Sequence, residues 1–426
     1  MRTWNDLYKM LKNGEMDRSL MQTGCEDINA YRTRATEVMN GFEKTFGVKE
    51  DTLAALCSAP GRTEICGNHT DHQHGHVLAA AVNLDFLACV SPNGTQTVHF
   101  QSEGWPMTTV DLSDLKQQEA EKETTASLVR GVMAELAKAG YTIGGFDMYA
   151  VSNVLPGSGL SSSAACEILL GVAGNHLFCQ DELDAVTLAK IGQKAENQYF
   201  GKPSGLMDQT ASSVGDAVAI DFSDPSAPIV RSVTANLEEL GLALCIVDCG
   251  ADHAALTGEY ASIPREMEQV AAFFGKKVLR EVQEEEVLKA MPQLRRAVGD
   301  RAVLRALHFY ADDRRAVEEA DALEQRDRDA FLQLVKESGR SSWELLQNIT
   351  PAGAVEAQDM AIALEAAEIA LNGKGACRVH GGGFAGTIQA FVPTESVSEF
   401  CERMELMLRK GCCHVLNIRP VGGIVL

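Results

Sequence analysis

A segment rich in glycine and serine, P-G-S-G-L-S-S-S-A-A, occupies residues 156–165. It lies between a predicted strand and a long apolar run that predicts a helix. Gly157 and Gly159 allow a tight turn and a close approach of the backbone to a ligand. The serines then stand at the helix start, where free N–H groups and the positive end of the dipole favour an anion. The pattern predicts a phosphate-binding loop made of Pro156, Gly157, Ser158, Gly159, Leu160, Ser161, Ser162 and Ser163. The alternative is an ordinary helix with a serine cap.

The same loop offers hydroxyl groups to a metal ion. Ser162 or Ser163 can supply an oxygen to Mg²⁺, which prefers oxygen ligands and bridges phosphates. The segment is not a G-x4-G-K-[ST] P-loop, because no lysine occupies the expected place.

Two charged residues elsewhere have the chemistry that phosphorylation of a hydroxyl requires. The reaction needs a carboxylate for the hydroxyl proton and a cation for the developing negative charge. Asp208 lies close to Gly205 in a compact segment and is the predicted carboxylate. Arg62 follows Pro60 and Gly61 in a rigid turn, and we expect it to pair with Asp208 and the phosphate. The alternatives are a helix-capping aspartate and a purely structural ion pair.

Three segments together resemble the GHMP kinases. The loop at 156–165 is similar to the family pattern P-x-G-x-G-L-x-S-S-A. Residues 59–72, A-P-G-R-T-E-I-C-G-N-H-T-D-H, resemble the galactokinase signature A-P-G-R-x-N-x-I-G-E-H-T-D-Y. Residues 195–209, A-E-N-Q-Y-F-G-K-P-S-G-L-M-D-Q, are similar to A-E-x-x-F-x-G-x-x-C-G-I-M-D-Q. A third glycine loop spans residues 381–386. The resemblance covers nearly the whole chain and points to the galactokinase branch.

This resemblance implies an α+β, two-domain GHMP kinase fold. It implies a ribosomal-S5-domain-2-like domain, which we place at residues 1–239, and a ferredoxin-like domain at 240–426, with the active site in the cleft between them. The implied reaction moves the terminal phosphoryl group of ATP onto a sugar, with D-galactose giving galactose 1-phosphate. Asp208 and Arg62 are then the catalytic residues, and Ser163 and Glu196 are the Mg²⁺ ligands.

The resemblance also implies a set of sugar-binding residues: Asn68, His69, Asp71, Gly205 and Tyr260. Position 68 departs from the family, which has glutamate there. Glutamate only accepts hydrogen bonds, whereas an amide both donates and accepts. Asn68 is compatible with a sugar hydroxyl and also with a C6 carboxylate, so a uronic acid is the alternative substrate. The asparagine of the signature is replaced by Glu64, and its tyrosine by His72.

Two further alternatives concern the kind of function. Alternation along a strand would place His72, His74 and His76 on one face, where a zinc site is conceivable. No cysteine or second carboxylate completes that set, which favours a polar, partly exposed segment. The whole chain is alternatively a non-catalytic sugar and ATP sensor. Such sensors have a deletion or change within the serine segment, whereas here Ser161 to Ala165 is uninterrupted.

The elements that position these residues are predicted from hydrophobic periodicity. The first 50 residues read as helical, and the first half then has strands near 63–65, 76–82, 86–90 and 146–151, with helices at 127–139 and 181–198. A strand at 242–247 opens the second half. Its predicted helices span 261–274, 284–291, 300–323, 328–338 and 354–371, and a strand-like tail surrounds the third glycine loop.

Composition limits the partners. The 426 residues carry 38 Lys+Arg against 59 Asp+Glu, a formal charge of −21, so we expect no nucleic-acid partner. No long uninterrupted apolar stretch predicts a membrane span, and the first residues lack a signal-peptide pattern. The 12 cysteines form no C-x2-C pair, which favours reduced thiols in a cytoplasm. We therefore expect a cytoplasmic monomer or weak homo-oligomer that binds a sugar and ATP.

Overall fold

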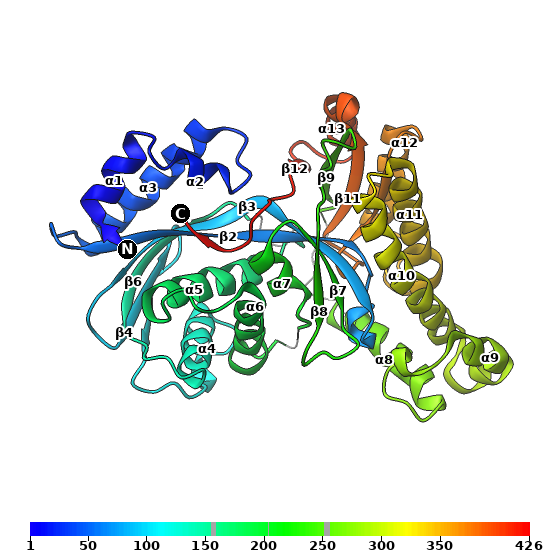
Figure 1. The fold of residues 1–426 in the computed structure, drawn as a ribbon. Coiled ribbons are helices and arrows are strands. Elements are labelled where there is room, and N and C mark those ends of the chain that lie inside the picture. The colour runs from blue at the N-terminus through cyan, green and yellow to red at the C-terminus, as the bar shows by residue number, and fades with distance from the viewer. Residues whose placement is uncertain (155–158, 203, 251–255) are drawn as a thin grey trace.

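The computed structural model describes residues 1–154, 159–202, 204–250 and 256–426 (Figure 1). The described strands form two sheets. The larger has the order β1-β2-β3-β6-β4-β5, with β13 on β2 and β7 between β3 and β8, and the smaller has the order β10-β11-β9-β12. The larger sheet consists of β1 (Arg2–Thr3), β2 (Leu53–Cys66), β3 (His76–Pro92), β4 (Thr97–Ser102), β5 (Thr108–Asp111), β6 (Phe146–Ser152), β7 (Ala217–Asp221), β8 (Ile229–Val233) and β13 (Ile424–Val425). The smaller consists of β9 (Leu242–Asp248), β10 (Ala376–His380), β11 (Thr387–Pro393) and β12 (Cys413–Leu416).

Helices cover both faces of the larger sheet (Figure 1). Successive side chains of a strand point to opposite faces, so a strand buried on both sides needs a continuous apolar run. In β2, Leu56 packs with α1–α3, whereas Cys57 packs with α4–α6. The helices of this half are α1 (Trp4–Lys12), α2 (Asp17–Met21), α3 (Ile28–Phe46), α4 (Thr125–Lys138), α5 (Ser162–Phe178), α6 (Ala185–Lys194) and α7 (Met207–Val214).

The smaller sheet also has helices on both faces. Leu244 of β9 packs with α10 and α11, and its neighbour Cys245 packs with α12 and α13. The helices of this half are α8 (Thr257–Phe273), α9 (Glu284–Val298), α10 (Asp300–Glu324), α11 (Arg328–Ser341), α12 (Asp359–Leu371) and α13 (Val397–Met407). The predicted α+β class is confirmed.

The two halves share one hydrophobic core. Ile65 and Leu78 of the larger sheet lie in the same cluster as Ile246 of β9 and Phe331 of α11. The final strand, β13, returns to the larger sheet, where Val425 pairs with Cys57. The boundary between residues 239 and 240 therefore stays a prediction, because core packing and the C-terminal tail both cross it.

Several predicted elements match the structure and others do not. The predicted strands at 146–151 and 242–247 correspond to β6 and β9. The single helix predicted at 181–198 is instead α6 followed by a π-helical turn, Ala195–Phe200 (η3). Residues 72–76 do not form the alternating strand that the zinc alternative required, in line with the polar segment that the sequence favoured. They contain the 3-10 turn Asp71–Gln73 (η1), and His74 then has a φ of 62° in the left-handed region.

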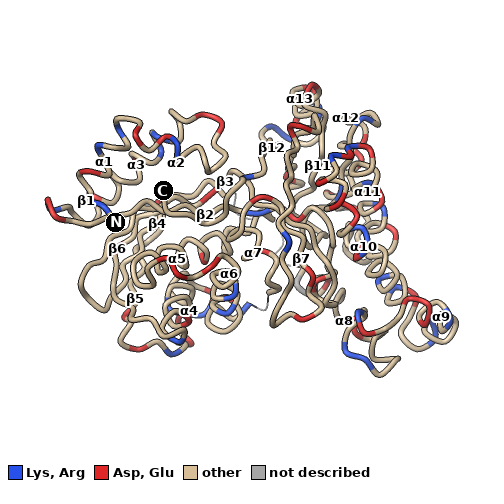
Figure 2. Tube along the Cα trace, in the orientation of Figure 1, with Lys and Arg blue, Asp and Glu red and all other residues tan. Residues whose placement is uncertain are grey.

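Charge is distributed over both halves. Asp and Glu alternate with Lys and Arg along the chain trace, including its helical layers (Figure 2). Within the described ranges, no helix has both the length and the apolar character required to cross a bilayer.

Candidate active site

A cleft of about 270 Å³ lies at the junction of the two sheets. Its walls come from β2, from the segment that follows β2, from residues 202–208 and from the loop after β10. Arg62 and Asp208 line it from one half and Gly381 and Gly382 from the other. The cleft thus contains six of the residues that the sequence singled out: Arg62, Asn68, His69, Asp71, Gly205 and Asp208.

Arg62 and Asp208 form a two-point ion pair in this cleft. Nε and Nη2 of Arg62 donate to the two carboxylate oxygens of Asp208 at 2.7 and 2.8 Å. Nη1 of Arg62 donates to the carbonyl of Gly159, and the hydroxyl of Ser161 donates to Asp208. The structure therefore brings the predicted catalytic pair to the end of the predicted phosphate loop.

The local backbone explains the position of Arg62. The pairing of β2 with β3 shifts register between Pro60 and Arg62, and such irregularities re-aim a side chain. A side chain at Gly61 would meet the carbonyl oxygen of Leu160 at 2.9 Å, so only glycine allows this close approach. The amide of Arg62 donates to that same carbonyl at 3.0 Å, which fixes β2 to the loop.

Electrostatics keep the pair ionised. Burial acts to raise the pKa of Asp208, but the charge of Arg62 and hydrogen bonds from Arg62 and Ser161 outweigh it, so this pKa is lowered. Burial acts to lower the pKa of Arg62, and the charge of Asp208 outweighs that effect and raises it. Asp208 is therefore a carboxylate across the neutral range.

The loop enters α5 through a left-handed residue. Ser161 has a φ of 53°, and α5 begins at Ser162. Gly159 has a φ of 72°, and a side chain there would meet Nδ1 of His380 at 3.1 Å, so glycine is required. The predicted loop residues Pro156, Gly157 and Ser158 lie outside the described residues.

Glu196 is buried on the π-helical turn η3 and faces four donors. The hydroxyl of Ser163 lies 3.2 Å from its Oε1, and the ammonium of Lys202 lies 3.0 Å from the same atom. Ser204 and Gln209 donate to Oε2. A carboxylate beside a helix-start hydroxyl is a hard oxygen set that fits Mg²⁺, so the two predicted metal ligands are adjacent.

Four of the predicted sugar-binding residues share the cleft with Asp208. Asn68, His69, Asp71 and Gly205 line the cleft. A side chain on Gly205 would overlap Oδ2 of Asp71. Nε2 of His69 lies 3.0 Å from the carbonyl of Gly382, and burial lowers the pKa of His69 to about 4. Tyr260 lies behind this wall, where its hydroxyl donates to the carbonyl of Gly383 at 2.8 Å.

Three further residues were not predicted for the site. Glu64 lines the cleft beside Asn68, and Lys202 lines it beside Asp208. Gln209 bridges Glu196 to the fully buried Glu167 at 2.9 Å from each carboxylate. A usable signal for Lys202 was that it is the only cation in the 195–209 segment. The signal for Glu64 was its departure from the signature.

The histidines of the zinc-site alternative, His72, His74 and His76, do not converge. Nδ1 of His76 lies 3.0 Å from Asp313, whereas His72 is exposed and stacks on His69. In the part of the chain that the structure describes, one group of metal-ligating side chains does converge: Cys245, Cys401 and Cys413, on β9, α13 and β12. None of these cysteines lines the cleft.

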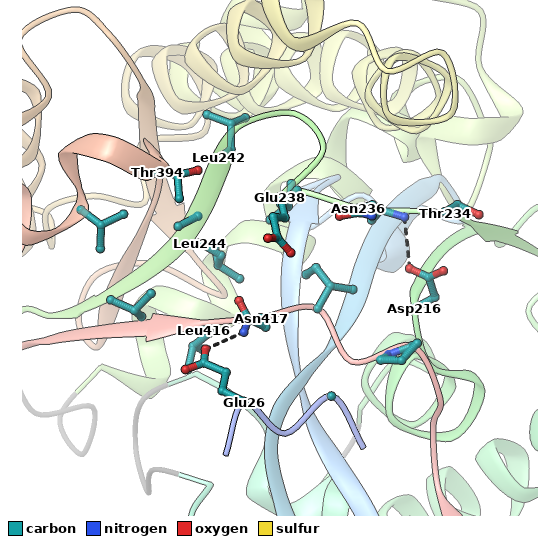
Figure 3. A pocket seen from close by; sticks show the side chains of 18 residues that line it. Glu26, Asp216, Thr234, Asn236, Glu238, Leu242, Leu244, Thr394, Leu416 and Asn417 are labelled. Carbon is teal, nitrogen blue, oxygen red and sulfur yellow. Dashed lines mark hydrogen bonds between the residues drawn. The ribbon is translucent and has the colours of Figure 1, made fainter. Parts of the chain in front are cut away.

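A larger cavity, about 720 Å³, lies elsewhere at the junction (Figure 3). Figure 3 shows Glu26, Asp216 and Glu238 on its walls, with Glu26 bonded to Asn417. Its lining residues, all of them described, include no Lys or Arg. A polyphosphate needs cations or free N–H groups, so the smaller cleft with Arg62 and Lys202 is the better nucleotide site.

Known proteins resemble this chain over most of its length. Residues 127–216 match the family described as the GHMP kinases N terminal domain, and residues 40–92 match the galactokinase galactose-binding signature. A galactokinase of Glaesserella parasuis serovar 5 (strain SH0165) is 30% identical over 375 residues, which cover 84% of this chain and 89% of that protein. The chain belongs to the galactokinase family. A galactokinase of Actinobacillus pleuropneumoniae is 31% identical over 353 residues, with 81% of this chain and 87% of the relative covered.

Solved structures extend the likeness of this galactokinase-family chain to its fold. Lactococcus lactis galactokinase, solved with galactose, superposes with a TM-score of 0.78 at 23% identity, covering 92% of this chain and all (100%) of that one. Methanococcus jannaschii mevalonate kinase superposes with a TM-score of 0.60 at 14% identity, covering 86% of this chain and 98% of that one. At these identities the structures establish the shared GHMP kinase fold.

Proposed function

We propose that this chain is an ATP-dependent sugar 1-kinase that converts D-galactose to galactose 1-phosphate. The observation that carries the proposal is the Arg62–Asp208 pair, held against the end of the glycine-serine loop through Gly159 and Ser161. A carboxylate and a guanidinium then face one small cleft, and Ser161 at the start of α5 donates to that carboxylate. Phosphoryl transfer depends mainly on such positioning and charge stabilisation.

Each residue has a role in this proposal. The helix start at Ser162 binds the phosphate tail of ATP. Asp208, ionised at neutral pH, accepts a hydrogen bond from the attacking hydroxyl and aligns it. Its lowered pKa makes it a weak base, which favours alignment over early proton removal. Arg62 holds Asp208 in place and offsets negative charge that develops during transfer.

Ser163 and Glu196 would hold Mg²⁺ in the proposed enzyme, and the ion would supply charge neutralisation on the phosphates. Lys202, whose ammonium lies beside Glu196, is then free to pair with a phosphate oxygen. His69, Asp71, Gly205 and Tyr260 remain the proposed sugar-binding set. The cytoplasmic location and the monomeric or weakly oligomeric state also remain proposals. The first is supported by the 12 cysteines being free thiols.

The test is ADP release over a panel of galactose, galacturonate, N-acetylgalactosamine, glucose and arabinose. We expect turnover with galactose. Asp208→Asn should reduce kcat by about 10²–10⁴-fold while ATP still binds, because the hydroxyl is no longer aligned. Asp300→Asn, which removes an exposed pair with Arg295, is the matched control and should leave kcat unchanged. ATP binding without turnover on any sugar would instead support the sensor alternative.

A further inference from the structure

We propose that Glu64, rather than Asn68, is the carboxylate that binds a sugar hydroxyl in this chain, and that it restricts the site to neutral sugars. This inference rests on the proposed function, because it concerns the substrate of the same cleft. It begins with the hydrogen bonds of two neighbouring side chains on the cleft wall.

The amide of Asn68 has no capacity left for a ligand. Its two N–H groups donate to Oε1 of Glu64 at 2.8 Å and to the carbonyl of Gly381 at 2.7 Å. Its oxygen accepts from Asn348 at 2.7 Å and from Ser342 at 3.5 Å. An asparagine side chain offers two donors and one oxygen with two lone pairs, so every position is used. Asn68 is also 0% exposed.

Glu64 is in the opposite situation. Its Oε1 accepts from Asn68 and, at 3.3 Å, from Arg378. Its Oε2 accepts no hydrogen bond from the described residues, although the side chain is 5% exposed and lines the cleft. This oxygen is open to the cleft, where a ligand hydroxyl would supply the donor that the protein does not.

Asn68, Arg378 and the backbone together fix this carboxylate. Arg378 is 0% exposed and also donates to the carbonyl of Ile65, so it anchors Glu64 from behind the wall. The backbone of Asn68 is fixed in turn. Its backbone N–H donates to Asp312, and its backbone carbonyl oxygen lies 3.0 Å from Nε2 of His308. The free oxygen is therefore held in one position, which is what a specific hydroxyl contact requires.

The charge of the wall decides the class of sugar. Glu64, Asp71 and Asp208 all face the cleft. Among the cations at the cleft, Arg62 is bonded at two points to Asp208, Lys202 is paired with Glu196, and Arg378 lies behind Glu64. A uronic acid would add a fourth carboxylate to these three, and the like charges would repel. A neutral sugar instead brings hydroxyl groups that donate hydrogen bonds to them. The replacement of glutamate by asparagine at position 68 thus does not open the site to an anionic sugar, because the carboxylate is retained at position 64.

The two residues are exchanged relative to the family signature. That signature has asparagine at the position of Glu64 and glutamate at the position of Asn68. The amide and carboxylate remain in contact at 2.8 Å in the exchanged order. Because the amide donates to the carboxylate, the exchange of the two residue types keeps one amide donor and one carboxylate acceptor on the cleft wall.

Calorimetric titration with galactose and galacturonate measures this directly, without requiring turnover. Loss of a hydrogen bond to a charged group corresponds to about 10- to 100-fold in affinity. We expect Glu64→Gln to weaken galactose binding by about 10- to 100-fold. The ratio of the affinity for galactose to the affinity for galacturonate should also decrease. KM should change by a similar factor and kcat by much less. Glu64→Asp, which keeps the charge on a shorter stem, provides a second variant if Glu64→Gln does not fold.

Controls separate this inference from the proposed function. Glu135→Gln changes a buried glutamate of α4 that does not line the cleft, so it should leave both affinities unchanged. Adding Asn68→Glu to Glu64→Asn should recover part of the galactose affinity that Glu64→Asn loses. Equal wild-type affinities for the two sugars, or an unchanged galactose affinity in Glu64→Gln, would overturn the inference. Absence of ADP release from a wild type that binds galactose would overturn the kinase proposal alone.

Discussion

Glu64 gives the site a titratable group near neutral pH. Burial raises its pKa to about 7, although Arg378, Arg62 and Asn68 act to lower it, while Asp71 acts to raise it. The ionised form is the stronger acceptor, so kcat/KM for galactose should rise as the pH increases through about 7. His69, with a pKa of about 4, does not titrate in this range. Initial rates at low galactose concentration, measured from pH 5.5 to 8.5, give this rise of kcat/KM with pH. Its persistence in Glu64→Gln would assign it to another group.

Single residues also show where prediction from the sequence ends. The chemistry of Arg62 and Asp208 was predictable because both residues lie in compact segments of recognisable pattern. The saturation of Asn68 was not, because its partner Asn348 lies 280 residues further along the chain and Gly381 lies 313 residues further. Which donor is already used depends on the tertiary structure, and no local spacing records it.

At the scale of elements, the segment from η3 to α7 carries both Glu196 and Asp208, with Gly205 between them. A methyl group on Gly205 would overlap Oδ2 of Asp71 and displace it. Gly205→Ala should therefore raise KM for galactose by about tenfold or more, since a displaced carboxylate loses its hydroxyl contact. Steady-state kinetics on galactose measure this. Gly144→Ala is the matched control, because the added carbon would lie 3.5 Å from its nearest neighbour, Phe178, which is an ordinary contact. Equal KM values in the two variants would contradict the expectation.

The same segment explains an error in the predicted elements. The composition of residues 181–198 favours one helix, yet the backbone widens into a π-helical turn at Ala195. The cause is tertiary, because Gly131 of α4 packs so closely that an added carbon there would lie 2.7 Å from Cβ of Ala195. Single-turn π-helices often occur at functional sites, and this one carries Glu196. The histidine segment also forms a turn, where Gly75 packs against Phe309 of α10.

At the scale of the whole molecule, buried carboxylates should determine how stability depends on pH. Glu319 of α10 is 0% exposed, and burial raises its pKa from 4.5 to about 8. The folded protein therefore holds this proton more tightly than the unfolded chain. Its contribution to stability is complete below about pH 4.5 and is lost as the pH rises toward 8. Glu319→Gln should thus raise the melting temperature more at pH 8.5 than at pH 5.5, by about 1 °C for each kcal/mol in a chain of this length. Differential scanning calorimetry of the variant and of the exposed control Glu344→Gln measures this difference. The same shift at both pH values would exclude Glu319 as the source.

The α+β class of the fold was predictable from the sequence, but the way the C-terminal tail connects to the larger sheet was not. Alternating apolar runs indicated strands such as β6 and β9, and the mixture of helices and strands indicated α+β. The short strands β7, β8 and β13 were not predicted. Each has only two to five residues, too few for a clear period. The partnership of Asp85 with Arg419 spans 334 residues, so only the fold reveals that the tail belongs with the first sheet.

The return of that tail has a consequence for how the protein is made. β2 emerges early from the ribosome, but its partner β13 and the fully buried Arg419 are translated only near the end of the described chain. Until then Asp85 lacks one of its two guanidinium partners, and the edge of β2 at Cys57 and Ser58 has no strand partner. Domains usually fold in order as they leave the ribosome. Here the half that emerges first reaches its final form only after the half that follows it.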